Sequence, residues 1–242
     1  MVSHRLGLTL AQQAVDDKTN EIKAIETILE EIVLTGRVLT MDALLTQRQV
    51  AQTIVDKGGD YVMIAKANQP KLKEEIELVF TLPPAGDRQE YIRTVDTGHG
   101  RIETRNLTTS EALVGYSDWP GMSQVFEVRR QVIEKKTGNE RVEVVYGITS
   151  LSPEQADPSR LLELVRGHWG IENRSHWVRD VTFDEDRSQV RSGNIPQLMA
   201  SLRNTAIGLL RKAGYTNIAQ ACRKMAAQPA NALALVGIEF EN

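Results

Sequence analysis

The chain has 242 residues, 41% hydrophobic and 25% charged, which predicts a soluble globular protein with one large domain or a core and an elaboration. No run approaches the roughly 18 apolar residues of a membrane helix, and no signal-peptide pattern is visible, which argues against a membrane protein and against secretion. The single cysteine excludes an internal disulfide and agrees with a cytoplasmic location, while the net charge of −3 argues against a protein that simply coats nucleic acid.

The first 80 residues predict a strand–helix–strand unit. A helix over TNEIKAIETILEEIVLTG, ended by Gly36, precedes a buried strand, RVLTMDALL, that ends near Asp42. A second helix, TQRQVAQTIVDKGG, leads to the strand YVMIAK, which ends at Lys66. Such a unit forms a parallel crossover, so Asp42 and Lys66 are expected at the carboxyl ends of two strands, where open α/β sheets place their chemistry. The alternative, that Asp42 only caps the following turn, stays open.

The predicted secondary structure changes near Thr81, where strands replace helices. EYIRTVDTGHGRIETRNL predicts a hairpin that turns at DTGHG, and SQVFEVRRQVIEKKTGNERVEVVYGITSL predicts a longer hairpin that turns at TGN. We interpret this stretch as a β-rich insertion in the α/β core. Its basic residues belong either to a solvated hairpin face or to a phosphate-binding surface, and they are Arg93, Arg101, Arg105, Arg129, Arg130, Lys135, Lys136 and Arg141.

Helices return in the last third of the chain. Asp157 followed by Pro158 is a typical helix start, and the helix runs into RGHWGIENRSHWVRD. Gly167 and Gly170 lower helix stability, so they indicate that another element packs closely there. Further helices are expected over IPQLMASLRNTAIGLLRKAG, ended by Gly214, and over NIAQACRKMAA, before an apolar tail.

One segment, RGHWGIENRSHWVRDVTFDED, gathers two of the three tryptophans and two of the four histidines around Glu172. His168, Glu172 and His176 share one helical stripe because they are spaced by four residues. The stripe is open to three interpretations. It is a polar strip at a packing interface, a zinc or iron site with two histidines and a carboxylate, or a magnesium site in which Glu172 is one oxygen ligand. The second is disfavoured because the two histidines lie about 12 Å apart along the helix axis.

RGHWGIENRSHWVRDVTFDEDRSQVR followed by IPQLMASLRNTAIGLL closely resembles the C-terminal catalytic block of DDE insertion-sequence transposases, in the branch with the H-repeat-associated proteins. The resemblance continues in KTNEIKAI, VLTMDALLTQ, GGDYVMIAKANQP and HGRIETRNL, in the same order, and so covers nearly the whole chain. It implies an α/β fold with a ribonuclease-H-like catalytic core and a β-rich insertion. Its expected function is DNA transposition.

The family's chemistry implies three carboxylates that hold two magnesium ions, with manganese as a substitute, for attack on a DNA phosphodiester. The matching catalytic and metal-binding positions here are Asp42 and Glu172. The expected partner is DNA, as insertion-sequence ends and target, and a homodimer is possible. We predict DNA-binding or positioning roles for a further set of residues: Lys66, Asn68, Arg101, Arg105, Arg166, His168, Asn173, His176 and Arg179.

The sequence departs from the family at its first carboxylate, which belongs to an Asp-Gly-Lys block on the first central strand. No such block is found, and the opening residues VSHRLGLTLAQQAV resemble the family's second and third strands. We therefore expect the first central strand to be missing and the chain to be an N-terminally truncated, inactive fragment. The alternative function is a non-catalytic remnant that binds DNA or an intact transposase. The expected division is a truncated first half of the core at 1–80, the insertion at 81–150, the second half of the core at 151–213 and a helical tail at 214–242.

Overall fold

A parallel strand–helix–strand unit forms where the sequence predicts one. Strand β1 (Val38–Met41) and strand β2 (Asp60–Ala65) pair in parallel, and helix α2 (Arg48–Asp56) connects them. The helix is amphipathic, and its Val50 and Ile54 are fully buried. Burying this apolar stripe stabilises the unit and sets the two strand ends at one edge of the sheet.

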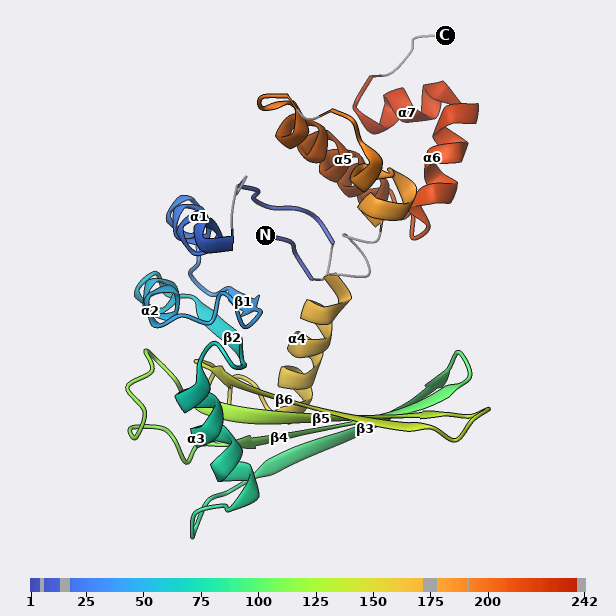
Figure 1. The fold of residues 1–242 in the computed structure, drawn as a ribbon. Helices are drawn as coiled ribbons and strands as arrows, with labels where there is room; N and C mark the ends of the chain where they lie inside the picture. Colours follow the sequence, from blue (N-terminus) through green and yellow to red (C-terminus); the bar gives the residue numbers. More distant parts are fainter. Residues whose placement is uncertain (5–6, 14–17, 172–177, 191, 239–242) are drawn as a thin grey trace. The chain divides into compact units, whose positions relative to one another are not determined.

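Strand β2 also joins this unit to a larger antiparallel sheet. Its second neighbour is β6, with Val62 opposite Thr149 and Ala65 opposite Tyr146, so the strands form one six-stranded sheet in the order β1-β2-β6-β5-β4-β3 (Figure 1). The strand-rich stretch therefore continues the sheet of the parallel unit. Its four strands are β3 (Glu90–Gly98), β4 (Arg101–Ser110), β5 (Gln124–Glu134) and β6 (Glu140–Thr149).

Both predicted hairpins are confirmed. Strands β3 and β4 are joined by a turn of only two residues, His99 and Gly100, since Gly98 pairs directly with Arg101. Strands β5 and β6 turn through residues 135–139, as the TGN sequence predicted. The hairpins bury a core that includes Leu107, Phe126, Val128 and Ile148.

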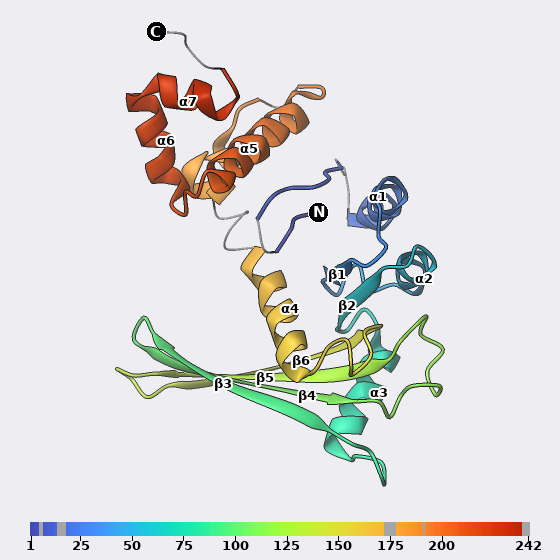
Figure 2. The ribbon, with the colours of Figure 1, turned by 180° about the vertical axis from the view of Figure 1, so that it is seen from behind.

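Helices cover both faces of this sheet near its parallel end. Helix α3 (Pro70–Thr81) crosses one face, and helix α4 (Pro158–Ile171) starts against the other (Figures 1 and 2). The predicted cap of α4 is confirmed, because the Asp157 carboxylate accepts a hydrogen bond of 2.8 Å from the Arg160 amide. The sequence interpretation had left α3 unassigned.

Helix α1 (Lys18–Glu31) is shorter than the sequence predicted. The expected end at Gly36 was wrong, because the chain leaves the helix after Glu31 and turns to insert Leu34 into the core, where it is 1% exposed. Gly36 belongs to this turn, with a φ of +69°, and its amide donates to the Gly58 carbonyl. Packing of Leu34 thus overrides a helix that local periodicity would extend.

The structure is a computed structural model that describes residues 1–4, 7–13, 18–171, 178–190 and 192–238, and every structural statement refers to these residues. The chain separates into two compact units, one of residues 15–166 and the other of residues 1–14 with 167–242. In the described part, no helix combines the length and apolarity needed to cross a membrane. The finer division at residues 80, 150 and 213 stays a prediction.

The second unit is helical. A cluster of Val178, Ile207, Leu210, Ile218 and Ala221 forms its core. Gly214, with a φ of +87°, follows α5 as predicted. The elements of this unit are a π-helical turn (Val178–Thr182), a 3-10 turn (Glu185–Arg187), α5 (Ile195–Lys212), α6 (Ile218–Ala227) and α7 (Pro229–Leu235).

Where the opening residues are described, they do not form the two strands that their resemblance suggested. In the described part of residues 1–13, one antiparallel bridge joins Val2 to Thr9, and the Ser3 amide donates to the Leu8 carbonyl at 2.8 Å. Helix α5 contacts this segment, because the Arg211 guanidinium donates to the Gly7 carbonyl oxygen and the Asn204 side-chain amide donates to the Gln12 side-chain oxygen at 2.6 Å.

Gly147 lies at the crowded centre of the sheet. A Cβ atom there would stand 2.6 Å from the Met63 carbonyl oxygen and would also overlap the Phe126 ring. We expect Gly147→Ala to lower the free energy of unfolding by about 3 kcal/mol, because a rigid strand and a buried ring must move. Gly98→Ala is the control, since a Cβ there meets nothing within 4 Å. Equal denaturant midpoints for the two variants would contradict this packing.

Candidate active site

Asp42 and Lys66 lie where the crossover predicts, directly after β1 and β2 at the carboxyl edge of the parallel pair. Both residues are exposed. The Asp42 carboxylate accepts one long hydrogen bond, 3.3 Å, from the Leu45 amide to its Oδ1 atom. Within the described residues its Oδ2 atom has no hydrogen-bond partner. Asp42 therefore caps the following turn and still presents an oxygen to a ligand.

The backbone that positions Asp42 is fixed by a buried threonine. The Thr46 hydroxyl lies 2.9 Å from the Asp42 carbonyl oxygen and 2.7 Å from the Ile64 carbonyl oxygen of β2. Thr46 is 0% exposed, so its hydroxyl lies where water does not compete for these contacts. The end of β1 is thereby tied to β2 through a side chain as well as through the sheet.

The loop after β2 also holds the loop after β1. The Asn68 side-chain amide donates to the Ala43 carbonyl oxygen, and the Gln69 amide donates to the Thr46 carbonyl oxygen at 3.0 Å. Asn68 thus contacts the residue next to Asp42 and helps to fix the position of the loop that carries Asp42. The sequence interpretation missed Gln69, whose signal was its place just before Pro70 at a helix start.

A cavity of about 400 Å³ opens beside this edge. Arg48 stacks over the Trp119 ring at 5.2 Å from its centroid and donates to the Asp118 carbonyl oxygen at 2.8 Å. The Trp119 indole N–H is buried without a hydrogen-bond partner in the described part of the chain. Gln69 and Tyr116 line the same cavity. Sequence reasoning found none of its aromatic residues.

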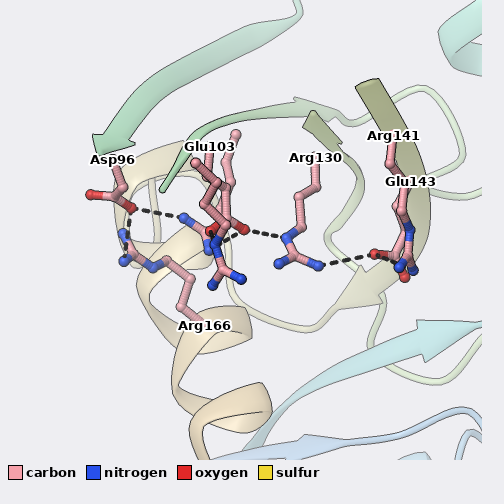
Figure 3. Close-up of polar contacts among 8 residues, drawn as sticks. Asp96, Glu103, Arg130, Arg141, Glu143 and Arg166 are labelled. Carbon is pink, nitrogen blue, oxygen red and sulfur yellow. Dashed lines mark hydrogen bonds and ion pairs between the residues drawn. The ribbon is translucent and has the colours of Figure 1, made fainter. Parts of the chain in front are cut away.

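The basic residues of the hairpins gather around one buried carboxylate (Figure 3). Glu103 is 6% exposed, and its carboxylate binds Arg105 at 2.6 Å and accepts a hydrogen bond from Arg130. Asp96 extends the network, because it binds both Arg105, at 2.8 Å, and Arg166 of α4, at 3.2 Å. We call this set the Glu103 cluster, which consists of Asp96, Arg101, Glu103, Arg105, Arg130, Arg141, Glu143 and Arg166.

Opposing effects set the ionisation of this cluster. Burial alone would raise the pKa of Glu103, but the hydrogen bond from Arg130 and the charges of Arg105, Arg130 and Arg101 hold that pKa below its ordinary value. Burial lowers the pKa of Arg105, and the neighbouring carboxylates offset this only in part. The cluster has five arginines and three carboxylates, so it retains positive charge that can attract a phosphate.

The Glu103 cluster belongs to the same sheet as the carboxyl edge of the parallel pair, which we call the Asp42 edge, and lies further along the strands. Tyr146 of β6 stands opposite the last residue of β2, and Glu143 follows three residues further along the strand away from the parallel pair. At about 3.3 Å per residue, the near end of the cluster, at Arg130 and Glu143, therefore lies about 10 Å beyond the carboxyl edge, and Arg101 lies further out, at the turn between β3 and β4. Of the predicted DNA contacts, Arg101 and Arg166 keep about half of their side chains exposed, whereas only 12% of the Arg105 side chain is exposed.

Two further predicted residues belong to the helical unit. His168 lies near the end of α4, and its ring centroid is 6.5 Å from that of His4. A Cβ on Gly167 would overlap the His4 ring, which confirms that a close contact forms at this glycine. Arg179 is engaged internally, since its guanidinium binds both oxygens of the Glu185 carboxylate, with 3.0 Å between Nη2 and Oε1.

The remaining predicted site residues, Glu172, Asn173 and His176, lie outside the described residues. The predicted proximity of Asp42 and Glu172 therefore stays a prediction. Where the chain is described, no three histidine, cysteine, aspartate or glutamate side chains converge as a metal site would require. Asp42 offers an exposed carboxylate oxygen on a fixed backbone, which is a type of ligand that magnesium accepts.

An α/β sheet with an exposed aspartate at its parallel carboxyl edge and an arginine cluster along its antiparallel strands is consistent with a DDE transposase domain. The chain belongs to that family, because the family model described as "Transposase DDE domain" matches residues 1–209.

Similar proteins agree with this assignment. The chain is 32% identical over 216 residues to "Putative transposase YncI" of Escherichia coli O157:H7, a match that covers 86% of this chain and 54% of the relative. It is 29% identical over 211 residues to "H repeat-associated putative transposase YhhI" of Escherichia coli strain K12, covering 84% and 55%. The chain thus spans about half the length of these relatives.

Glu103→Gln should destabilise the fold. Removing the shared partner leaves Arg105 and Arg130 poorly compensated in a largely buried site, which should cost about 3 kcal/mol in unfolding free energy. Because the folded pKa lies below the ordinary 4.5, the native carboxylate stabilises the fold above that pH, and this contribution is lost as the pH falls through the folded pKa. Denaturant melts from pH 7 to pH 3 should therefore converge for the two proteins. Glu140→Gln, at an exposed site, is the control.

Proposed function

We propose that this chain acts in DNA transposition as a DDE catalytic domain, with Asp42 and Glu172 as magnesium ligands. The observation that supports this most is Asp42, which combines an exposed carboxylate oxygen with a backbone fixed by Thr46 at the end of a parallel strand. The two carboxylates would hold magnesium there, and the bound ion would supply activation of an attacking oxygen and stabilisation of a leaving one. Manganese, with similar oxygen preference, would substitute.

The residues around Asp42 would then position DNA. Lys66 presents an exposed ammonium group at the same edge, while Asn68 holds the loop next to Asp42. Arg101 and Arg166 of the Glu103 cluster remain about half exposed and can reach a phosphate, whereas Arg105 orients Asp96 and Glu103. We assign Asn173, His168 and His176 to substrate positioning and Arg179 to holding Glu185. The chain would form a homodimer in order to pair two DNA ends.

A second candidate function rests on Arg101 and Arg166 of the Glu103 cluster, whose half-exposed guanidinium groups can bind a phosphate without a metal ion. In this function the 242 residues would bind DNA or an intact transposase without cutting DNA. Gel shifts and plasmid nicking separate the two functions. DNA binding without magnesium- or manganese-dependent nicking supports the non-catalytic role, and nicking that disappears in Asp42→Asn supports the catalytic one.

Asp42→Asn tests the metal assignment directly. Asparagine keeps the shape and an oxygen that can accept the Leu45 hydrogen bond, but it removes the negative charge that attracts the cation. We expect Mn²⁺ affinity, measured by electron paramagnetic resonance, to fall at least about tenfold, a cost near 1.4 kcal/mol. The thermal melt should change little, because the carboxylate is exposed.

The matched control is Asp56→Asn, an exposed aspartate at the end of α2 whose carboxylate accepts a hydrogen bond from Gln52. It should leave Mn²⁺ affinity unchanged. Glu172→Gln should weaken binding as Asp42→Asn does. If both variants retain the native affinity, neither residue is a metal ligand and the proposed chemistry fails.

A further inference from the structure

The two hairpins end in a pair of adjacent turns that we call the double tip, residues 98–101 and 134–141. The Lys135 amide donates to the Gly100 carbonyl oxygen at 2.8 Å, so the turns lie side by side. Figures 1 and 2 show the four strands continuing well past α3 to reach them. Hydrogen bonds stiffen the second turn, from the Gly138 amide to the Glu134 carbonyl oxygen and from the Thr137 hydroxyl to the Glu134 carboxylate.

The first turn contains a histidine in an unfavourable backbone conformation. His99 has a φ of +48° and Gly100 a φ of +74°, as a two-residue hairpin loop of this type demands. Asparagine, aspartate or glycine fits the first position better, and a left-handed residue with another side chain costs about 1 kcal/mol. The His99 side chain is exposed, and no contact within the described residues recovers this cost. Its exposed imidazole is therefore available for a contact outside the chain.

The double tip also exposes cations that lack partners. Lys135 and Lys136 are exposed, and no carboxylate among the described residues forms an ion pair with either ammonium group. The nearby acids, Glu134 and Glu140, accept hydrogen bonds from the neutral Thr137 hydroxyl and Gln131 amide, and their two charges leave the four cations of the tip in excess. Arg101 and Arg141 add exposed guanidinium groups. The tip thus offers positive charge to an anionic partner.

The position of the double tip relates it to the candidate active site. Tyr146 stands opposite the last residue of β2, and β6 extends six residues further, to Glu140, in the direction in which β2 points at the Asp42 edge. Six residues of a strand span about 20 Å. Along duplex DNA, that length corresponds to about six base pairs.

We propose that the double tip binds the backbone and groove of duplex DNA about six base pairs from the bond held at the Asp42 edge. A β-ribbon fits the major groove, which is about 12 Å wide, with the Lys135 and Lys136 ammonium groups on phosphates and the His99 imidazole directed into the groove. This proposal rests on the proposed function, because it requires DNA to be the substrate of the same sheet edge.

The test measures binding of the full chain to a fluorescein-labelled duplex of random sequence, by anisotropy across a salt series. Each phosphate contact contributes about 0.9 to the slope of log affinity against log salt, so Lys135→Ala/Lys136→Ala should reduce that slope by about two. His99→Gly should weaken binding about three- to tenfold, which corresponds to one lost hydrogen bond, while its melting temperature stays equal or rises. Arg88→Ala, an exposed arginine just before the opposite end of β3, is the matched control.

The outcomes separate this proposal from the proposed function. If the native chain binds DNA and the tip variants keep its slope and affinity, the double tip is not a DNA contact, although the transposase function stands. An equal loss in Arg88→Ala would also overturn the proposal, because it would reflect net charge alone. If the native chain binds no duplex even at low salt, both proposals fail.

Discussion

The placement of β2 between a parallel and an antiparallel neighbour is the constraint on which the rest of the first unit depends. Side chains reinforce the antiparallel side, where the Thr149 hydroxyl donates to the Tyr61 carbonyl oxygen at 2.7 Å and the Tyr61 amide donates to the Ser150 hydroxyl at 2.9 Å. Thr149 and Tyr61 are both 0% exposed. Because β2 is paired on both sides, the Asp42 edge and the two hairpins become parts of one rigid sheet. A displacement of either would break buried hydrogen bonds.

This shared sheet gives the charges of the hairpins a fixed relation to Asp42. The arginines of the Glu103 cluster are not interchangeable, because burial divides them into two groups. Arg105 is enclosed and forms ion pairs with Glu103 and Asp96, so it stabilises the hairpin. Arg101 and Arg141 instead keep much of their side chains exposed to solvent. The enclosed ion pair of Arg105 and the half-exposed guanidinium group of Arg101 thus lie on the same strand, β4.

Local patterns predicted most of the fold. The crossover around α2, the cap at Asp157 and both hairpins depend on residues close in sequence, and each was predicted from its own segment. Helix α3 was overlooked, although Pro70 at its start with Leu72, Ile76 and Val79 at helical spacing would have indicated it. The end of α1 was wrong because the burial of Leu34 depends on tertiary packing that no local pattern contains.

The candidate site was less predictable, because its decisive contacts join distant residues. Asp42 and Lys66 were placed correctly, since the direction of two parallel strands fixes both positions at once. The partners of Glu103 could not be read from the sequence, in which Arg130 is 27 residues away, and Arg166 is 70 residues from Asp96. The sequence positions of the basic residues do not reveal how deeply each side chain is buried. Burial, however, decides which guanidinium groups remain accessible to a phosphate.

A net charge of −3 is compatible with a locally positive surface. Arginine charge in the Glu103 cluster is only partly neutralised, and the lysines of the double tip have no acidic partners among the described residues, so positive potential concentrates along one line of the sheet. Acidic residues elsewhere lower the total without cancelling this local field, because screening confines each charge to about 10 Å at moderate salt. The proposed function would require carboxylates that bind metal to lie apart from cations that bind a polyanion. The six-stranded sheet separates the Asp42 edge, the arginines and the lysines along its length.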